Sequence, residues 1–103
     1  PVWLAPVQMI LLPITDRANA MAEKIAAQAQ DLGIRAELDL RNEKVNAKIR
    51  DAQLQKIPYM VVLGDREVET GQVAVRHRTQ GDLGQKPLEA FLAQISQEIK
   101  ARA

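Results

Sequence analysis

Residues 6–40 have the sequence PVQMILLPITDRANAMAEKIAAQAQDLGIRAELDL, and this segment carries the clearest secondary-structure signals of the chain. The apolar run over residues 6–14 predicts a short strand that is buried on both faces. Apolar residues then recur at helical spacing over residues 17–32, and Gly33 stands where a left-handed residue often ends a helix. Residues 34–40 alternate apolar and polar, as a half-covered or edge strand does. The segment therefore predicts a strand–helix–strand unit with parallel strands.

The rest of the chain adds two more helices and two more strands. The glycines within residues 64–71 and 81–84 indicate an irregular stretch and a loop. The elements expected from apolar spacing are a second helix at about 44–56, a central strand at 59–63, a fourth strand at 73–78 and a last helix at about 87–101.

The expected order β-α-β-α-β-β-α gives an α/β fold of three layers, with a mixed, mainly parallel sheet flanked by three helices. The first three strands should be parallel, because helices join them as right-handed crossovers. The fourth should run antiparallel, because its connection is too short to hold a helix.

The composition is that of one ordinary globular domain, which we expect to span residues 1–103. Hydrophobic residues make up 47% of the 103 residues and charged residues 26%. The chain has no cysteine, which excludes disulfides, thiolate metal sites and cysteine nucleophiles. The net charge of +1 does not by itself indicate a nucleic-acid binder, and no apolar run approaches the ~20 residues that cross a bilayer.

Several chemistries lack the residues they need. The first strand is followed by Ile14, Thr15 and Asp16 rather than by a glycine-rich phosphate loop. The single histidine, His77, cannot form a histidine cluster for zinc. Glu67 and Glu69 are paired carboxylates, but a solvated acidic turn is their simplest interpretation. The sequence therefore predicts no catalytic and no metal-binding residue.

A basic segment follows the second predicted strand, where open α/β sheets place ligand crevices. Residues 41–50 hold four basic side chains against one acid, Glu43. Lys44 and Lys48 stand four apart in the first turns of a helix, where positive charge opposes the helix dipole unless an anion binds. Both an anion-binding surface and a solvated helix face fit this pattern. The sequence also leaves the role of Tyr59 undecided, because its side chain can stack on a base or pack against the sheet.

Six strings, in their order and spacing, resemble the C-terminal anticodon-binding domain of threonyl-tRNA synthetase. Prolyl-, glycyl- and histidyl-tRNA synthetases share this class II domain. The likeness runs from Trp3 to the last helix, and it departs at Asn46-Ala47, where the family more often has glycine and a bulky residue. The strings are WLAPVQ (3–8), DLRNEK (39–44), KIR (48–50), IPYM (57–60), GDREVE (64–69) and VAVR (73–76).

The resemblance implies that the domain binds the anticodon loop of threonine tRNA, whose second and third anticodon bases, G and U, are the main identity elements. Carried over by motif, Asn42, Glu67 and Arg76 are the expected base readers. A carboxylate can accept from guanine, and a guanidinium can donate to base carbonyls. The expected contacts to RNA phosphates are Arg41, Lys44, Lys48, Arg50 and Arg78.

The resemblance also implies that the domain was excised from a longer, cytoplasmic threonine–tRNA ligase. That parent would use ATP and zinc, would form a homodimer through other domains, and would carry its catalytic domain in the same chain. This domain itself would hold no catalytic residue, cofactor or metal, and no membrane contact is expected. Two alternatives remain: a free-standing paralogue that acts as an accessory RNA-binding protein, and a small α/β enzyme or regulator with no RNA partner.

Overall fold

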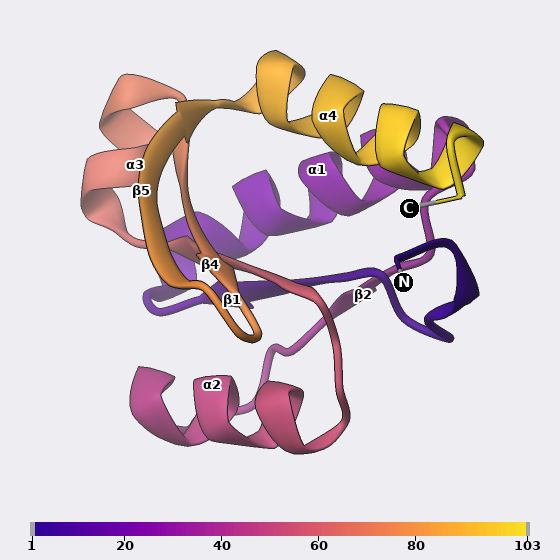
Figure 1. Ribbon diagram of the computed structural model, residues 1–103. Coiled ribbons are helices and arrows are strands. Elements are labelled where there is room, and N and C mark those ends of the chain that lie inside the picture. The colour runs from indigo at the N-terminus through magenta and orange to yellow at the C-terminus, as the bar shows by residue number, and fades with distance from the viewer. Residues whose placement is uncertain (1, 103) are drawn as a thin grey trace.

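The computed structural model describes residues 2–102, which form a five-stranded sheet with helices on both faces (Figure 1). The strands follow the order β2-β1-β3-β4-β5 across the sheet. They are β1 (Met9–Pro13), β2 (Ala36–Leu38), β3 (Tyr59–Leu63), β4 (Gln72–His77) and β5 (Gly81–Pro87). The helices are α1 (Asn19–Asp31), α2 (Val45–Leu54), α3 (Asp65–Thr70) and α4 (Leu88–Lys100), with 3-10 turns at Val2–Leu4 and Asp16–Ala18.

The strand directions agree with the sequence prediction. β1 pairs in parallel with β2 and with β3, so that Met9 lies opposite both Ala36 and Tyr59. β4 runs antiparallel to β3, and β5 runs antiparallel to β4. β3 is the central strand and β2 lies at an edge, as their sequence patterns predict.

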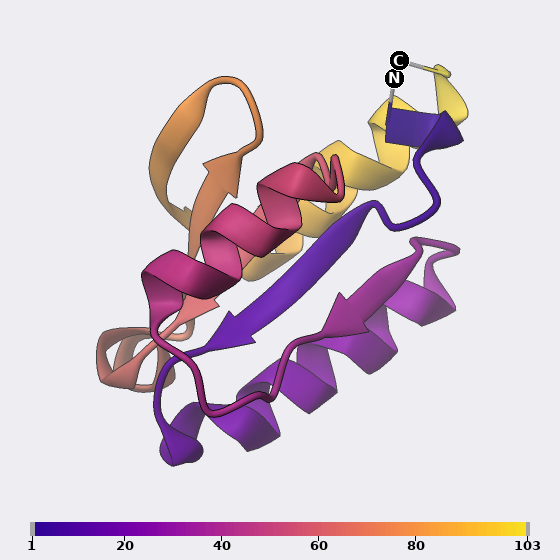
Figure 2. The ribbon, with the colours of Figure 1, turned by 90° about the horizontal axis from the view of Figure 1, so that it is seen from below.

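Two hydrophobic clusters fill the two sides of the sheet. Because side chains alternate along a strand, Leu11 of β1 faces α1 and α4, whereas Ile10 and Leu12 face α2. The larger cluster includes Ile25 of α1 and Phe91 of α4. Both faces of β1 are therefore covered, which explains its uninterrupted apolar run. Figure 2 shows α2 crossing the opposite face of the sheet from α1 and α4.

Two segments that the sequence predicts to be irregular form regular structure. The fold of residues 2–102 therefore has one strand and one helix more than expected. The stretch 64–71 holds the short helix α3, with Gly64 as its N-cap and Gly71 at φ 75° as its left-handed C-cap. The polar segment after β4 is strand β5, which contains a bulge opposite Val75 and Arg76. These glycines mark the ends of a helix and irregular points of a strand, which the sequence pattern alone does not separate from a loop.

Tyr59 lies in the core at the start of β3, with only 4% of its surface exposed. Its hydroxyl lies 2.8 and 2.9 Å from the two carboxylate oxygens of Glu98 on α4, to which it donates its proton. Its ring meets those of Phe91 and His77 edge-on. It therefore packs within the sheet and is not a base-stacking platform.

The free energy of unfolding should fall at alkaline pH because of Tyr59. Burial and the bond to Glu98 raise its pKa from 10.0 to about 12. The stabilisation is therefore complete below pH 10 and is lost as the pH rises from 10 to 12, with a decrease of about 2 kcal/mol. Urea unfolding across this range measures it. Tyr59→Phe, which removes the only tyrosine, should lose most of this decrease. An equally steep decrease in the variant would contradict the assignment.

Candidate nucleic-acid interface

The carboxyl ends of β1 and β2 surround a polar hollow of about 350 Å³. The β1–α1 connection contributes Thr15 and Asp16 to its lining, and the segment after β2 contributes Arg41 and Asn42. At this edge of the sheet, β1 lies between β2 and β3, which the chain reaches through helices on opposite faces. Open α/β sheets bind ligands at such a point. Three predicted RNA contacts, Arg41, Asn42 and Lys48, line this one hollow.

Arg41 is engaged by two carboxylates. Its Nε and Nη2 donate to Asp39 Oδ1 and Oδ2 over 2.9 and 2.8 Å, and Nη2 also lies 2.8 Å from Asp51 Oδ2. The side-chain bond from Arg41 lowers the pKa of Asp39 and outweighs the effect of burial. Arg41 thus braces the segment that carries Asn42 against α2, and its predicted phosphate contact stays a prediction.

Lys48 is buried beneath the same segment, with only 3% of its surface exposed. Its ammonium Nζ donates to the backbone oxygens of Pro13 and Asp39, at 3.2 and 2.9 Å. The expectation that Lys48 lies at the surface beside Lys44 is therefore wrong, because the ends of β1 and β2 supply it with two acceptors. In this position Lys48 joins two strand ends to α2 and holds the Asn42 segment in place.

Glu67 is buried in the first turn of α3 and is 6% exposed. Its Oε1 accepts from the backbone N–H of Gly64 at 2.7 Å, and its Oε2 accepts from Gln85 Nε2 on β5 at 2.6 Å. Glu69 is exposed and lies 3.8 Å from Arg17. The two carboxylates therefore diverge, and Glu67 is not part of a solvated turn. Gln85 also belongs to this site, although no motif of the sequence points to it.

Gly64 lets the chain pass close to its neighbours at this point. A Cβ atom there would lie 3.0 Å from Ile14 Cδ1 and 3.4 Å from Glu67 Oε1. The end of β3 and the β1–α1 connection are thus packed together, which places Glu67 next to the edge that holds Asn42.

Arg76 lies on the sheet face that α2 covers only in part. It is paired with Met60, a member of the α2 cluster, whereas Ala74 of the same strand is paired with Gln85. Alternation along β4 therefore puts Arg76 and Gln85 on one face. The Nε of Arg76 is buried and has no hydrogen-bond partner within residues 2–102.

The other predicted contacts are exposed side chains. Asn42, Lys44 and Arg50 lie on the surface, and so does Arg78, which stands beside Pro58 at the opposite end of the sheet. Asn46 and Ala47 belong to the first turn of α2. Asn46, which stands where the family more often has glycine, does not adopt a left-handed backbone.

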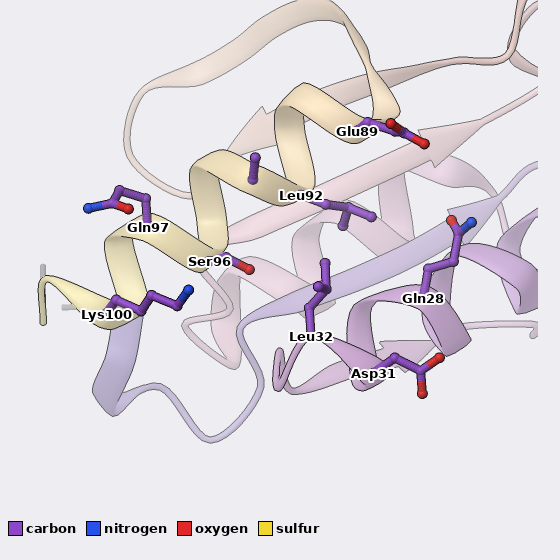
Figure 3. A pocket seen from close by; sticks show the side chains of 9 residues that line it. Gln28, Asp31, Leu32, Glu89, Leu92, Ser96, Gln97 and Lys100 are labelled. Carbon is purple, nitrogen blue, oxygen red and sulfur yellow. The ribbon is translucent and has the colours of Figure 1, made fainter.

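A second hollow, of about 650 Å³, lies between α1 and α4 (Figure 3). Its lining combines charged side chains with Leu32, of which 55% is exposed. None of the predicted RNA contacts lines it.

Residues 2–102 hold no group of three or more His, Asp or Glu side chains placed to bind a metal ion. None of the helices in this part of the chain has the length and apolar character needed to span a membrane.

The chain is similar to known proteins in both sequence and structure. The family model described as the anticodon binding domain matches residues 8–98. The chain belongs to this family. Among solved structures, the RNA binding domain of threonyl-tRNA synthetase from Cryptosporidium parvum is similar over 94% of the chain, with a TM-score of 0.86 and 28% identity. That match covers 24% of the Cryptosporidium chain.

Curated relatives of this anticodon-binding domain include threonine–tRNA ligases. One from Syntrophomonas wolfei is 57% identical over 97% of the chain, and one from Halorhodospira halophila is 56% identical over 96%. The domain spans only 16% of the length of each. Histidyl-tRNA synthetase from S. aureus shares the fold, with a TM-score of 0.78 and 22% identity over 90% of this chain and 24% of its own.

Proposed function

We propose that this anticodon-binding domain binds the anticodon loop of threonine tRNA within a longer threonine–tRNA ligase. Asn42, Glu67 and Arg76 contact bases, and the exposed Lys44, Arg50 and Arg78 contact phosphates, with Arg41 at the margin. Lys48 positions the Asn42 segment. The ligase relatives support this proposal over a free-standing accessory protein, and the family membership favours an RNA partner over a small enzyme or regulator.

The observation that carries the proposal is the buried Nε of Arg76, which has no hydrogen-bond partner within residues 2–102. A buried guanidinium N–H without an acceptor costs about 1–3 kcal/mol, a cost that a ligand carbonyl can remove. Arg76 shares its sheet face with Gln85, whose amide is bonded to Glu67. Both Arg76 and the Glu67 carboxylate thus offer hydrogen-bonding capacity to bases splayed out of a loop.

The catalytic parts of the proposed ligase lie outside this domain. ATP and zinc would serve the parent enzyme, and residues 2–102 do not fit either group. They hold no metal-binding cluster, and Ile14-Thr15-Asp16 replaces a phosphate-binding loop after β1. The proposal also includes a catalytic domain in the same chain, a homodimer formed by other domains and a cytoplasmic location.

An amide NMR titration with the threonine anticodon stem-loop tests the proposal. At fixed, moderate salt we expect selective shifts in residues 41–50, 64–68 and 74–76 with the cognate loop. A control loop with cytosine in place of the central guanine should shift the exposed basic residues but not the amides around Glu67. Equal shifts with both loops would reduce the interface to a basic RNA-contact surface.

A further inference from the structure

The Glu67–Gln85 pair presents more hydrogen-bonding groups than the proposed role of Glu67 as a base reader uses. A carboxylate only accepts hydrogen bonds, so the Gln85 amide must turn its Nε2 toward Glu67 Oε2, as the 2.6 Å contact shows. The two side chains come from α3 and β5, eighteen residues apart in sequence. They lie beside each other because β5 runs back along β4 toward the point where α3 leads into β4.

Within residues 2–102, the atoms Oε1 and Oε2 of Glu67 and Nε2 of Gln85 each have one hydrogen-bonding position in use and one without a partner. Each carboxylate oxygen has two lone pairs, of which Gly64 N–H uses one on Oε1 and Gln85 uses one on Oε2. The amide nitrogen has two hydrogens, of which one is used by Glu67. The free positions on Oε1, Oε2 and Nε2 are therefore acceptor, acceptor and donor.

The Watson–Crick edge of guanine has the complementary order. Its exocyclic N2 and its N1 donate, and its O6 accepts. We propose that Gln85 is a specificity-determining residue that donates its second Nε2 hydrogen to guanine O6 while Glu67 accepts from N1 and N2. This inference rests on the proposed function, in which Glu67 reads a guanine. Adenine would bring its C6 amine against the Gln85 donor and lacks the hydrogen on N1.

Gln85 could instead act only by orienting Glu67, and two modified bases separate these roles. Inosine keeps N1–H and O6 but lacks the N2 amine, so it probes the contact to Glu67. Thioguanine keeps N1–H and the amine but has sulfur, a weak acceptor, in place of O6, so it probes the contact to Gln85.

The experiment measures the affinity of the 103-residue chain for anticodon stem-loops with guanine, inosine, thioguanine or cytosine at the central anticodon position. The original chain should bind the inosine and thioguanine loops about five- to tenfold more weakly than the guanine loop. Gln85→Leu should bind the guanine and thioguanine loops equally and keep the inosine penalty. Gln97→Leu is the matched control, because Gln97 is exposed on α4 and lines the hollow between α1 and α4, which contains none of the predicted RNA contacts. It should keep both penalties.

A second variant, Gln85→Met, guards against a failure of Gln85→Leu to fold, and thermal unfolding identifies a variant that has lost its structure. Loss of both penalties in the folded variants would show that Gln85 only orients Glu67, and retention of both would show that it does not touch the base. Either result overturns the inference. Equal binding of the guanine and cytosine loops by the original chain would overturn the proposed function itself.

Discussion

Glu67→Gln is expected to lower the preference of the domain for guanine over adenine at the central anticodon position by roughly ten- to a hundredfold. Gly64 N–H requires an acceptor at Oε1, so the new amide must place its nitrogen where Oε2 stood. That nitrogen then meets guanine N1–H donor to donor. The Gln85 amide must also turn to present its oxygen, and the resulting row of hydrogen-bonding groups suits adenine. Affinities for guanine and adenine stem-loops measure the change.

Glu69→Gln is the matched control for this substitution. It removes the same charge from the same helix, but Glu69 is exposed and its contact with Arg17 is long. We expect it to leave base preference unchanged and to alter affinity for all loops alike. An unchanged guanine preference in Glu67→Gln would contradict a direct contact between this side chain and the base.

Lys48→Met is expected to lower the free energy of unfolding by about 3 kcal/mol. The methionine fills similar space but leaves the backbone oxygens of Pro13 and Asp39 without their shared donor. Urea unfolding measures the loss. Because Lys48 is buried, the salt dependence of RNA binding should stay as it is in the original chain. An undiminished stability would show that the two carbonyls find other donors.

Lys44→Met, one helical turn away, should behave in the opposite manner. Lys44 is exposed, so its loss should leave unfolding unchanged. If it contacts a phosphate, the slope of log affinity against log salt should fall by about 0.7. A flattened slope in Lys48→Met would instead favour the phosphate contact that the sequence predicts for that lysine.

The sequence predicts the elements whose buried faces produce a regular spacing of apolar residues. Both faces of β1 and one face of α1 are packed, so their patterns are unambiguous. β5 has no such pattern, because its residues are half-buried or exposed and its place is set by pairing with β4. The six residues of α3 are too few to show a helical period, and its flanking glycines resemble those of a turn.

Residues of the candidate site could be predicted only where they belong to a motif of the family that the sequence resembles. Asn42, Glu67 and Arg76 came from the resemblance, and their roles as base readers stay a prediction. The burial of Lys48 depends on carbonyl oxygens at the ends of two separate strands, which no local spacing reveals. Gln85 is likewise defined by a partner on another element, and a lone glutamine in a polar stretch gives no signal.

The capping of α3 by Glu67 has a thermodynamic consequence for recognition. A free glutamate would have to give up rotational freedom about its side-chain bonds when a base arrives, at a cost of roughly 0.5–1.5 kcal/mol. Here Gly64 and Gln85 impose that restriction during folding. The side chain of Glu67 thus loses this entropy before the base arrives. A larger part of the free energy of each hydrogen bond to the base then contributes to the affinity.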